Sequence, residues 1–144
     1  MAAEKLQLRI IAPDAEKLNE TADMVIMRCT TGDMGIMPGH EACSAVLDDG
    51  VFRIFNDGEE RRMAVFGGIV QVLNNNVTVL ANDAQWPEDI DLARSEATRE
   101  QLERSLRESA GDAALKNDQV RLRRHLVRIE VSSYPLVGKV KPDK

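Results

Sequence analysis

The first 85 residues alternate between short apolar stretches and turn-forming residues. Leu6, Leu8 and Ile10 are separated by single polar residues, which is the period-two pattern of a strand with one buried face. Further apolar runs cover residues 24–27, 51–55, 63–66, 69–73 and 77–80. Many short strands with turn residues between them are typical of an antiparallel sandwich or barrel. We therefore predict a β-sandwich over residues 1–85.

Two glycine-containing segments interrupt this pattern. Residues 35–40 combine two glycines with a proline and predict a shaped loop. Gly67 and Gly68 are followed neither by Lys-Ser/Thr nor by a helix start, so they do not match a phosphate-binding loop. We expect instead that this pair allows close packing between strand backbones.

The pattern becomes helical after Trp86. Pro87 suits the first turn of a helix, and good helix formers without glycine or proline continue to about residue 109. A second helix is predicted from about residue 113 to 131, because leucine and isoleucine recur on one face. The short connection between them predicts an antiparallel pair. The expected fold is an all-β antiparallel sandwich (1–85), a C-terminal antiparallel two-helix hairpin (86–131) and a flexible tail (132–144).

The composition narrows the function classes. Aromatic residues make up 3% of the chain, too few for a nucleic-acid surface built on base stacking. No apolar run approaches the roughly 18 residues that a membrane-spanning helix needs, and residues 1–5 do not resemble a signal peptide. The two cysteines predict no disulfide framework. The net charge of −5 is uneven, because residues 1–85 carry 13 acidic and 7 basic side chains, whereas basic residues predominate after residue 113.

We find no convincing catalytic or metal site in the sequence. His40, Glu41 and Cys43 lie close together, but no second pair of metal ligands follows at a usable spacing. Ser44 lacks a nucleophile-elbow pattern and an acid that would orient His40. Residues 48–50, Asp-Asp-Gly, lack the spacing of a calcium loop and predict a turn. A non-enzymatic binding or coupling function is therefore favoured.

The second predicted helix carries a basic face. Its members are Arg121, Arg123, Arg124 and Arg128. One interpretation is a solvated surface, and the other is an anion site or a docking surface for an acidic partner. Asp91 and Arg94 of the first helix would complete an anion site if the hairpin folds on itself.

Three motifs together resemble the epsilon subunit of bacterial and chloroplast F-type ATP synthases. Residues 32–40 are similar to the family's G-x-x-G-I-x-P-G-H loop. Residues 64–72 are similar to its A-V-x-G-G strand pair, and residues 88–91 open the helical part as in the family. The resemblance runs from residue 6 to about residue 129.

This resemblance implies a non-catalytic subunit of the central stalk that needs no cofactor. Such a subunit is clamped to the gamma subunit, rests on the c ring and rotates with both, which couples ion flow to ATP synthesis on the alpha and beta subunits. The implied location is peripheral, at the cytoplasmic face of the cell membrane. Asp33 and His40 are the residues expected to contact the c ring. The sequence does not indicate whether the coupling ion is H⁺ or Na⁺.

The resemblance also implies two roles for the hairpin. When extended along gamma, the hairpin of the family inhibits ATP hydrolysis, and the arginines expected to dock on an acidic segment of beta are Arg121, Arg123, Arg124 and Arg128. When folded, the hairpin of some relatives binds ATP, and the matching residues here are Ile90, Asp91, Arg94, Arg124 and Arg128. Ser95 and Gln101 depart from the ATP-binding pattern, so the nucleotide site is expected to be weaker or lost in this chain.

Two interpretations from other classes stay open. A free-standing anion- or nucleic-acid-binding regulatory module predicts salt-dependent retention on heparin or DNA. A metal-dependent sandwich enzyme that uses His40 predicts stoichiometric metal in the purified protein. Neither explains residues 35–40 and the Gly67–Gly68 pair as well as a stalk subunit does.

Overall fold

The computed structural model describes residues 4–108 and 112–132, with the backbone alone for residues 112–115. Residues 109–111, which were expected to connect the helices, and most of the expected tail, residues 133–144, lie outside the described residues. The strands are β1 (Leu6–Ile11), β2 (Glu16–Ala22), β3 (Met24–Cys29), β4 (Gly32–Ile36), β5 (Cys43–Leu47), β6 (Gly50–Asn56), β7 (Glu59–Val65), β8 (Gly68–Leu73), β9 (Asn76–Ala81) and β10 (Ala84–Gln85). A short 3₁₀ turn, η1 (Pro87–Asp89), precedes α1 (Leu92–Glu108) and α2 (Asp112–Ser132).

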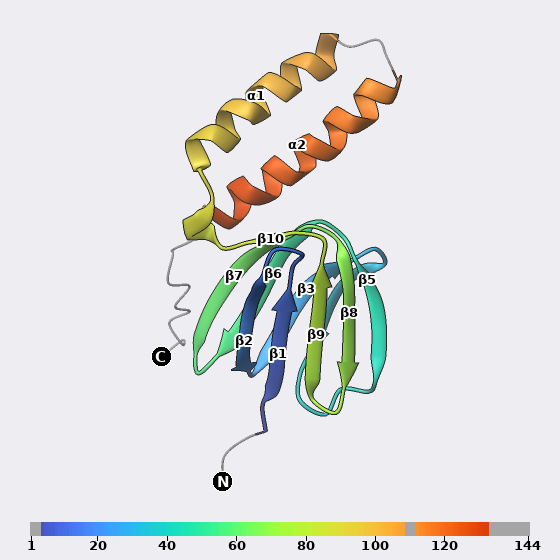
Figure 1. Cartoon of the computed structure of the whole chain (residues 1–144), viewed down its shortest axis with the longest axis vertical. Helices are drawn as coiled ribbons and strands as arrows, with labels where there is room; N and C mark the ends of the chain where they lie inside the picture. The colour runs from blue at the N-terminus through green and yellow to red at the C-terminus, as the bar shows by residue number, and fades with distance from the viewer. Residues whose placement is uncertain (1–3, 109–111, 133–144) are drawn as a thin grey trace.

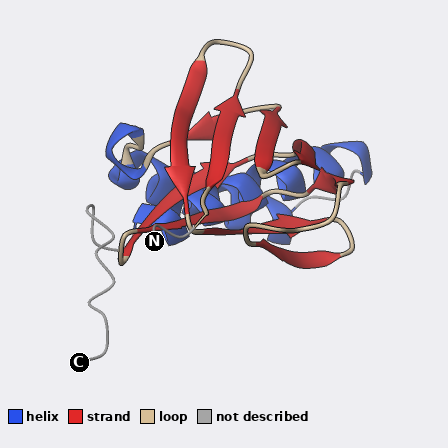
Figure 2. Cartoon of the chain, turned by 90° about the horizontal axis from the view of Figure 1, so that it is seen from below, coloured by secondary structure: helices blue, strands red, loops and turns tan. Residues whose placement is uncertain are grey.

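The strands form two layers of a nearly closed sandwich. Their order is β10-β7-β6-β3-β5-β8-β9-β1-β2, and β4 pairs with β3. The layers meet where Cys29 of β3 pairs with Leu47 of β5. Both helices lie at one end of the sandwich, opposite the start of β1 (Figure 1). Seen from the end without helices, the strands lie in front and the helices behind them (Figure 2). The expected sandwich followed by a helical hairpin is confirmed.

One strand pair departs from the expected antiparallel arrangement. β1 and β9 run parallel, with Leu8 opposite Val77 and Ile10 opposite Val79. A short hairpin forces neighbouring strands to be antiparallel, but β1 and β9 are far apart in the chain, so no turn fixes their direction. The turn pattern of the sequence therefore carries no information about this pair.

Some strands have no clear apolar pattern. In β2 only Leu18 and Ala22 are buried, because the strand lies at the end of the pairing order and its other side chains face solvent. Residues 35–40 were expected to form one loop, but β4 extends through Ile36, and only the remainder is loop. Ile36 is fully buried, and this burial favours the strand despite the neighbouring glycine.

The core fills the space between the two layers. Leu6, Leu8 and Ile10 are fully buried, as their period-two spacing predicts. Phe52 and Met63 from the opposite layer join them in the same cluster. The sandwich therefore has its own apolar core, independent of the helices.

The helical part begins later than the sequence predicts. Pro87 opens η1 rather than α1, and Ile90 has an extended backbone that separates the two. Asp91 then precedes α1 and caps its start, because its Oδ1 accepts a hydrogen bond of 3.1 Å from the backbone N–H of Arg94. This is an N-cap, which competes with continuing the helix backward to Pro87.

The Gly67–Gly68 pair confirms the expected close approach of strand backbones. Gly68 has a φ of +130°, and a Cβ placed there would lie 2.2 Å from the carbonyl oxygen of Leu80 on β9. Since that contact is with backbone atoms, the neighbour cannot rotate away. Only glycine fits at this position.

We predict that Gly68→Ala lowers the free energy of unfolding by about 3 kcal/mol or more, from backbone strain plus the clash with β9. Gly58→Ala is the matched control, because Gly58 also has a positive φ of +79° but no atom lies within 4 Å of its hypothetical Cβ. It should cost only about 1 kcal/mol. Urea unfolding of both variants gives the comparison. Equal losses would show that strain alone, without the clash, sets the cost.

Candidate functional site

The helical hairpin contacts the sandwich through the last turns of α2. Val127 and Val131 are buried against Ala64 and Phe66, and the partly buried Val51 and Ile90 pack around them. This second apolar cluster is small, and it lies on the outer side of β6 and β7 rather than in the main core. The contact determines which face of α2 turns toward the strands.

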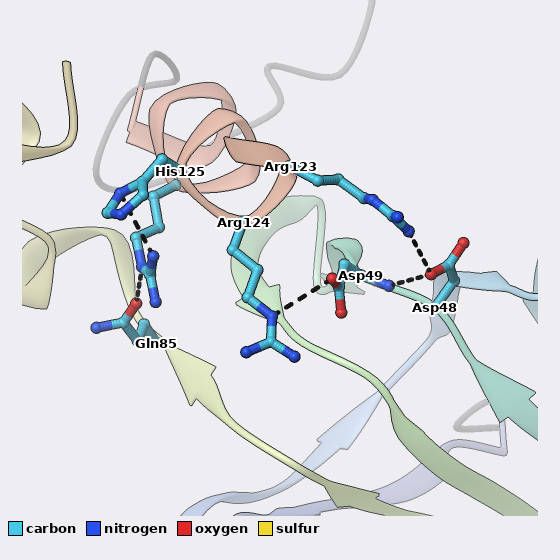
Figure 3. A network of polar contacts seen from close by, with 7 residues as sticks. Asp48, Asp49, Gln85, Arg123, Arg124 and His125 are labelled. Atoms are coloured by element: carbon cyan, nitrogen blue, oxygen red, sulfur yellow. Dashed lines mark hydrogen bonds and ion pairs between the residues drawn. The ribbon is translucent and has the colours of Figure 1, made fainter. Parts of the chain in front are cut away.

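That face is the basic one. Arg123 Nη1 lies 3.4 Å from Asp48 Oδ1, and Arg124 Nε lies 3.5 Å from Asp49 Oδ2 (Figure 3). The two aspartates belong to the turn between β5 and β6 that the sequence predicts. Two arginines expected to form a docking surface are thus paired with the sandwich of the same chain.

Arg128 reaches the sandwich at a different point. Its Nε donates a 2.6 Å hydrogen bond to Gln85 Oε1, and its guanidinium lies 4.7 Å from the centre of the Phe66 ring. Burial lowers the pKa of Arg128 below its ordinary value, an effect that the nearby Asp83 opposes. Arg121 instead lies 3.8 Å from Asp118 on its own helix. The four arginines of the basic face therefore have three different environments.

A cavity of about 380 Å³ lies between the helices and the end of the sandwich. It is lined by Gln85, Asp89, Ile90, Asp91, Arg94, Ser95, His125 and Arg128. Four of the five residues expected at a nucleotide site, Ile90, Asp91, Arg94 and Arg128, thus come together. Arg124 is not among the lining residues, because it points to Asp49.

His125 and Gln85 line this cavity although the sequence did not single them out. His125 follows Arg124 on α2, and one helical position turns the side chain by about 100°, from the aspartates toward the cavity. Partial burial lowers the pKa of His125, and the positive charges of Arg128, Arg121 and Arg94 lower it further. Arg128 Nη1 lies 3.5 Å from its Nδ1. The sequence does contain a pattern that could have indicated this role, namely a histidine within a cluster of arginines.

The structure separates Asp33 from His40. Asp33 lies in β4, 3.7 Å from Arg28, and lines a groove that Val127 and Glu130 of α2 also line. His40 follows β4, and the neighbouring Gly39 donates a 2.8 Å hydrogen bond from its backbone N–H to Asn75. Asn75 belongs to the β8–β9 turn, at the end of the sandwich away from the helices (Figure 1). The two residues therefore lie toward opposite ends of β4.

A row of exposed apolar side chains crosses the other layer. Val46 of β5 pairs with Ile69 of β8, which pairs with Leu80 of β9. Their exposed fractions are 56%, 51% and 54%. The same face also exposes Leu73. Contiguous apolar side chains of this kind on a sheet face indicate a protein-binding surface.

Within residues 4–108 and 112–132, no group of three or more metal-ligating side chains is placed to hold an ion. None of the helices in this part of the chain is long and apolar enough to cross a membrane. The His40 ring has a protein neighbour, since its Nδ1 lies 2.8 Å from the carbonyl oxygen of Glu41.

Comparison with known proteins relates both parts of this architecture to one family. The model of the ATP synthase delta/epsilon chain β-sandwich domain matches residues 5–87, which is more than half of the chain. The chain belongs to this family. The motifs at residues 32–40 and 64–72 that indicated it lie inside the matched region.

Curated relatives extend the family relationship beyond the sandwich. The ATP synthase epsilon chain of Prochlorococcus marinus (strain NATL1A) is 40% identical over 101 residues, covering 70% of this chain and 75% of the relative. The ATP synthase epsilon chain of Bacillus subtilis (strain 168) is 35% identical over 127 residues, covering 88% of this chain and 96% of the relative. An alignment of that length includes much of the hairpin.

A solved structure shares the fold. A chain in the cryo-EM structure of the Euglena gracilis mitochondrial ATP synthase OSCP/F1/c-ring aligns with a TM-score of 0.80 at 20% identity, covering 93% of this chain and 84% of that chain. The sandwich and the hairpin of this epsilon-family member thus occur together in a distant structure.

We predict that acidification from pH 7.5 to 5.5 lowers the thermal stability of the chain through His125. Its pKa is lowered in the folded state, so the unfolded state takes up the proton first as the pH falls. The stabilising effect is therefore complete above the unfolded pKa of about 6.5 and is lost as the pH falls below that value. Melting temperatures across this range should drop less in His125→Gln than in wild type. Parallel curves for the two proteins would contradict this role of His125.

Proposed function

We propose that this chain is a non-catalytic rotor subunit of an F-type ATP synthase, which couples ion flow to ATP synthesis and inhibits ATP hydrolysis through its hairpin. Membership in the delta/epsilon family and relatives named ATP synthase epsilon chain support the assignment. The single structural observation that carries it is the exposed apolar row on β5, β8 and β9. A subunit without an active site of its own has to act through such a surface.

The partner for this apolar row is the gamma subunit of the central stalk. In the isolated chain, about half of the surface of Val46, Ile69 and Leu80 is exposed to solvent. Burying them on a partner removes apolar surface from water, at about 25 cal/mol per Å². The row lies on a sheet, so strand pairing already holds its backbone and little backbone freedom is lost on binding.

The end of the sandwich that carries His40 and the β8–β9 turn is the proposed c-ring contact. Met37 in the same loop is 58% exposed, which adds apolar area to this end. Asp33 was expected to contribute as well, but it lies toward the other end of β4, in the groove that Val127 and Glu130 of α2 also line. The complex places the chain peripherally on the membrane, at its cytoplasmic face.

We predict that Ile69→Glu abolishes or strongly reduces co-purification with the gamma subunit, because it puts a charge at the centre of the apolar row. Leu92→Glu is the control, since Leu92 is also partly exposed but lies at the start of α1. Both variants should have the circular dichroism spectrum of wild type. Undiminished recovery of gamma with folded Ile69→Glu would exclude this face as the contact.

We also propose that the cavity between the helices and the sandwich binds ATP as a regulatory ligand. Arg94 and Arg128 supply positive charge for phosphates, and Asp91 also lines the cavity. The volume of about 380 Å³ falls within the range of small-molecule pockets. Arg124 is not needed in this arrangement, although the resemblance implies it.

If ATP binds there, Arg94→Ala should remove the increase in melting temperature that millimolar ATP causes in wild type. Arg107→Ala is the matched control, because Arg107 is on the same helix but in its last turn. Asp91→Ala is a less specific test, since it also removes the N-cap of α1. A melting temperature that does not respond to ATP in wild type would rule out the nucleotide site.

Inhibition of ATP hydrolysis is proposed to use Arg121, Arg123, Arg124 and Arg128 as the docking surface for an acidic segment of beta. The support is the clustering of these arginines on one helix. In the conformation described above, however, two of them are paired with the sandwich. External docking therefore requires that these pairs break.

A further inference from the structure

We propose that Asp48 and Asp49 form a charge latch with Arg123 and Arg124, which holds the hairpin on the sandwich and withholds these arginines from an acidic partner. The latch is a property of the chain itself. Its effect on inhibition rests on the proposed function.

The acidic side of the latch is held rigidly. The backbone N–H of Asp48 donates a 3.0 Å hydrogen bond to the carbonyl oxygen of Arg28, which ties the turn to the end of β3. Asp48 Oδ1 also accepts a 2.8 Å hydrogen bond from the N–H of Asp49. Gly50 follows the two aspartates and packs against Arg28. A Cβ at Gly50 would lie 2.8 Å from the arginine side chain. None of these contacts involves α2, so the sandwich alone holds the turn that carries both carboxylates.

The two ion pairs differ in their surroundings. The Asp49 side chain is only 10% exposed, whereas that of Arg124 is 44% exposed. With α2 docked, water is largely excluded from the carboxylate of this pair, which strengthens the attraction between the two charges. The Asp48–Arg123 pair is more open, with side-chain exposures of 39% and 53%. Salt screens the open pair more strongly than the shielded one.

The apolar contact beside the latch orients α2 but is small. Among the described side chains of α2, residues 116–132, Val127 and Val131 are the ones buried there, with Ala64 and Phe66. Other apolar residues of the helix, such as Val120 and Leu126, stay partly exposed. The two ion pairs add to this contact, each by up to about 1 kcal/mol, or about fivefold in the docking equilibrium. Because the apolar contact is small, a loss of that size shifts the balance between the docked and the released hairpin.

The latch and an external partner compete for the same guanidinium groups. Arg123 and Arg124 are paired with Asp48 and Asp49 when α2 is docked (Figure 3), so an acidic protein surface binds them only at the expense of these pairs. Weakening the latch shifts the population toward the released hairpin and raises the apparent affinity for such a partner by the same factor.

Hydrogen–deuterium exchange of the isolated full chain tests the latch directly. In Asp48→Asn/Asp49→Asn, peptides from residues 120–131 should exchange about three- to tenfold faster than in wild type, while peptides from β1, β8 and β9 stay unchanged. Unchanged strand peptides also show that the variant folds. Glu16→Gln is the control, because it breaks the exposed Arg9–Glu16 pair of 2.8 Å without touching the helix.

A charge swap provides the second arm. Asp48→Arg and Arg123→Asp should each accelerate exchange in α2, and the double variant should return it toward the wild-type rate. Raising NaCl from 0.05 M to 0.5 M should accelerate wild type more than Asp48→Asn/Asp49→Asn. The latch is overturned if Asp48→Asn/Asp49→Asn exchanges like wild type, or if the swap restores nothing. Since no other subunit takes part, this failure is distinct from loss of gamma binding in Ile69→Glu.

Discussion

The contact between Phe66 and two valines of α2 is the interaction on which the functional part of this molecule depends. Phe66 is fully buried directly after β7, and Val127 and Val131 cover it. The guanidinium groups of Arg124 and Arg128 lie 6.0 and 4.7 Å from its ring centre. This one apolar contact fixes the rotation of α2 about its axis, and the rotation decides which side chains face the aspartates and which face the cavity.

The sequence predicts local features well and long-range ones poorly. The alternation of Leu6, Leu8 and Ile10 and the crowded backbone at Gly68 both follow from short-range chemistry, and both are observed. The strand β2 could not be predicted because a strand with one paired edge and an exposed face has no apolar period. The parallel pairing of β1 with β9 could not be predicted because no turn connects them.

The candidate site shows the same division. Ile90, Asp91, Arg94 and Arg128 could be grouped from motif and helical spacing, and they do line one cavity. Arg124 turns away from this cavity and His125 turns into it. Both orientations depend on the rotation of α2 about its axis, which the contact with the sandwich fixes. The pairing of Arg123 with Asp48 joins residues 75 positions apart, so it depends on tertiary contacts alone. The basic face of the second helix, which the sequence offers as a solvated surface or a docking surface for an acidic partner, meets two aspartates of the acidic first part within this chain.

The apolar row and the hairpin lie on different layers. Val46, Ile69 and Leu80 belong to β5, β8 and β9, whereas α2 rests on β6 and β7. A protein bound through the first layer leaves the second uncovered. Release and return of the hairpin are then unimolecular events within an assembled complex, at a rate that does not depend on subunit concentration. The subunit would thus change its regulatory state without ever dissociating.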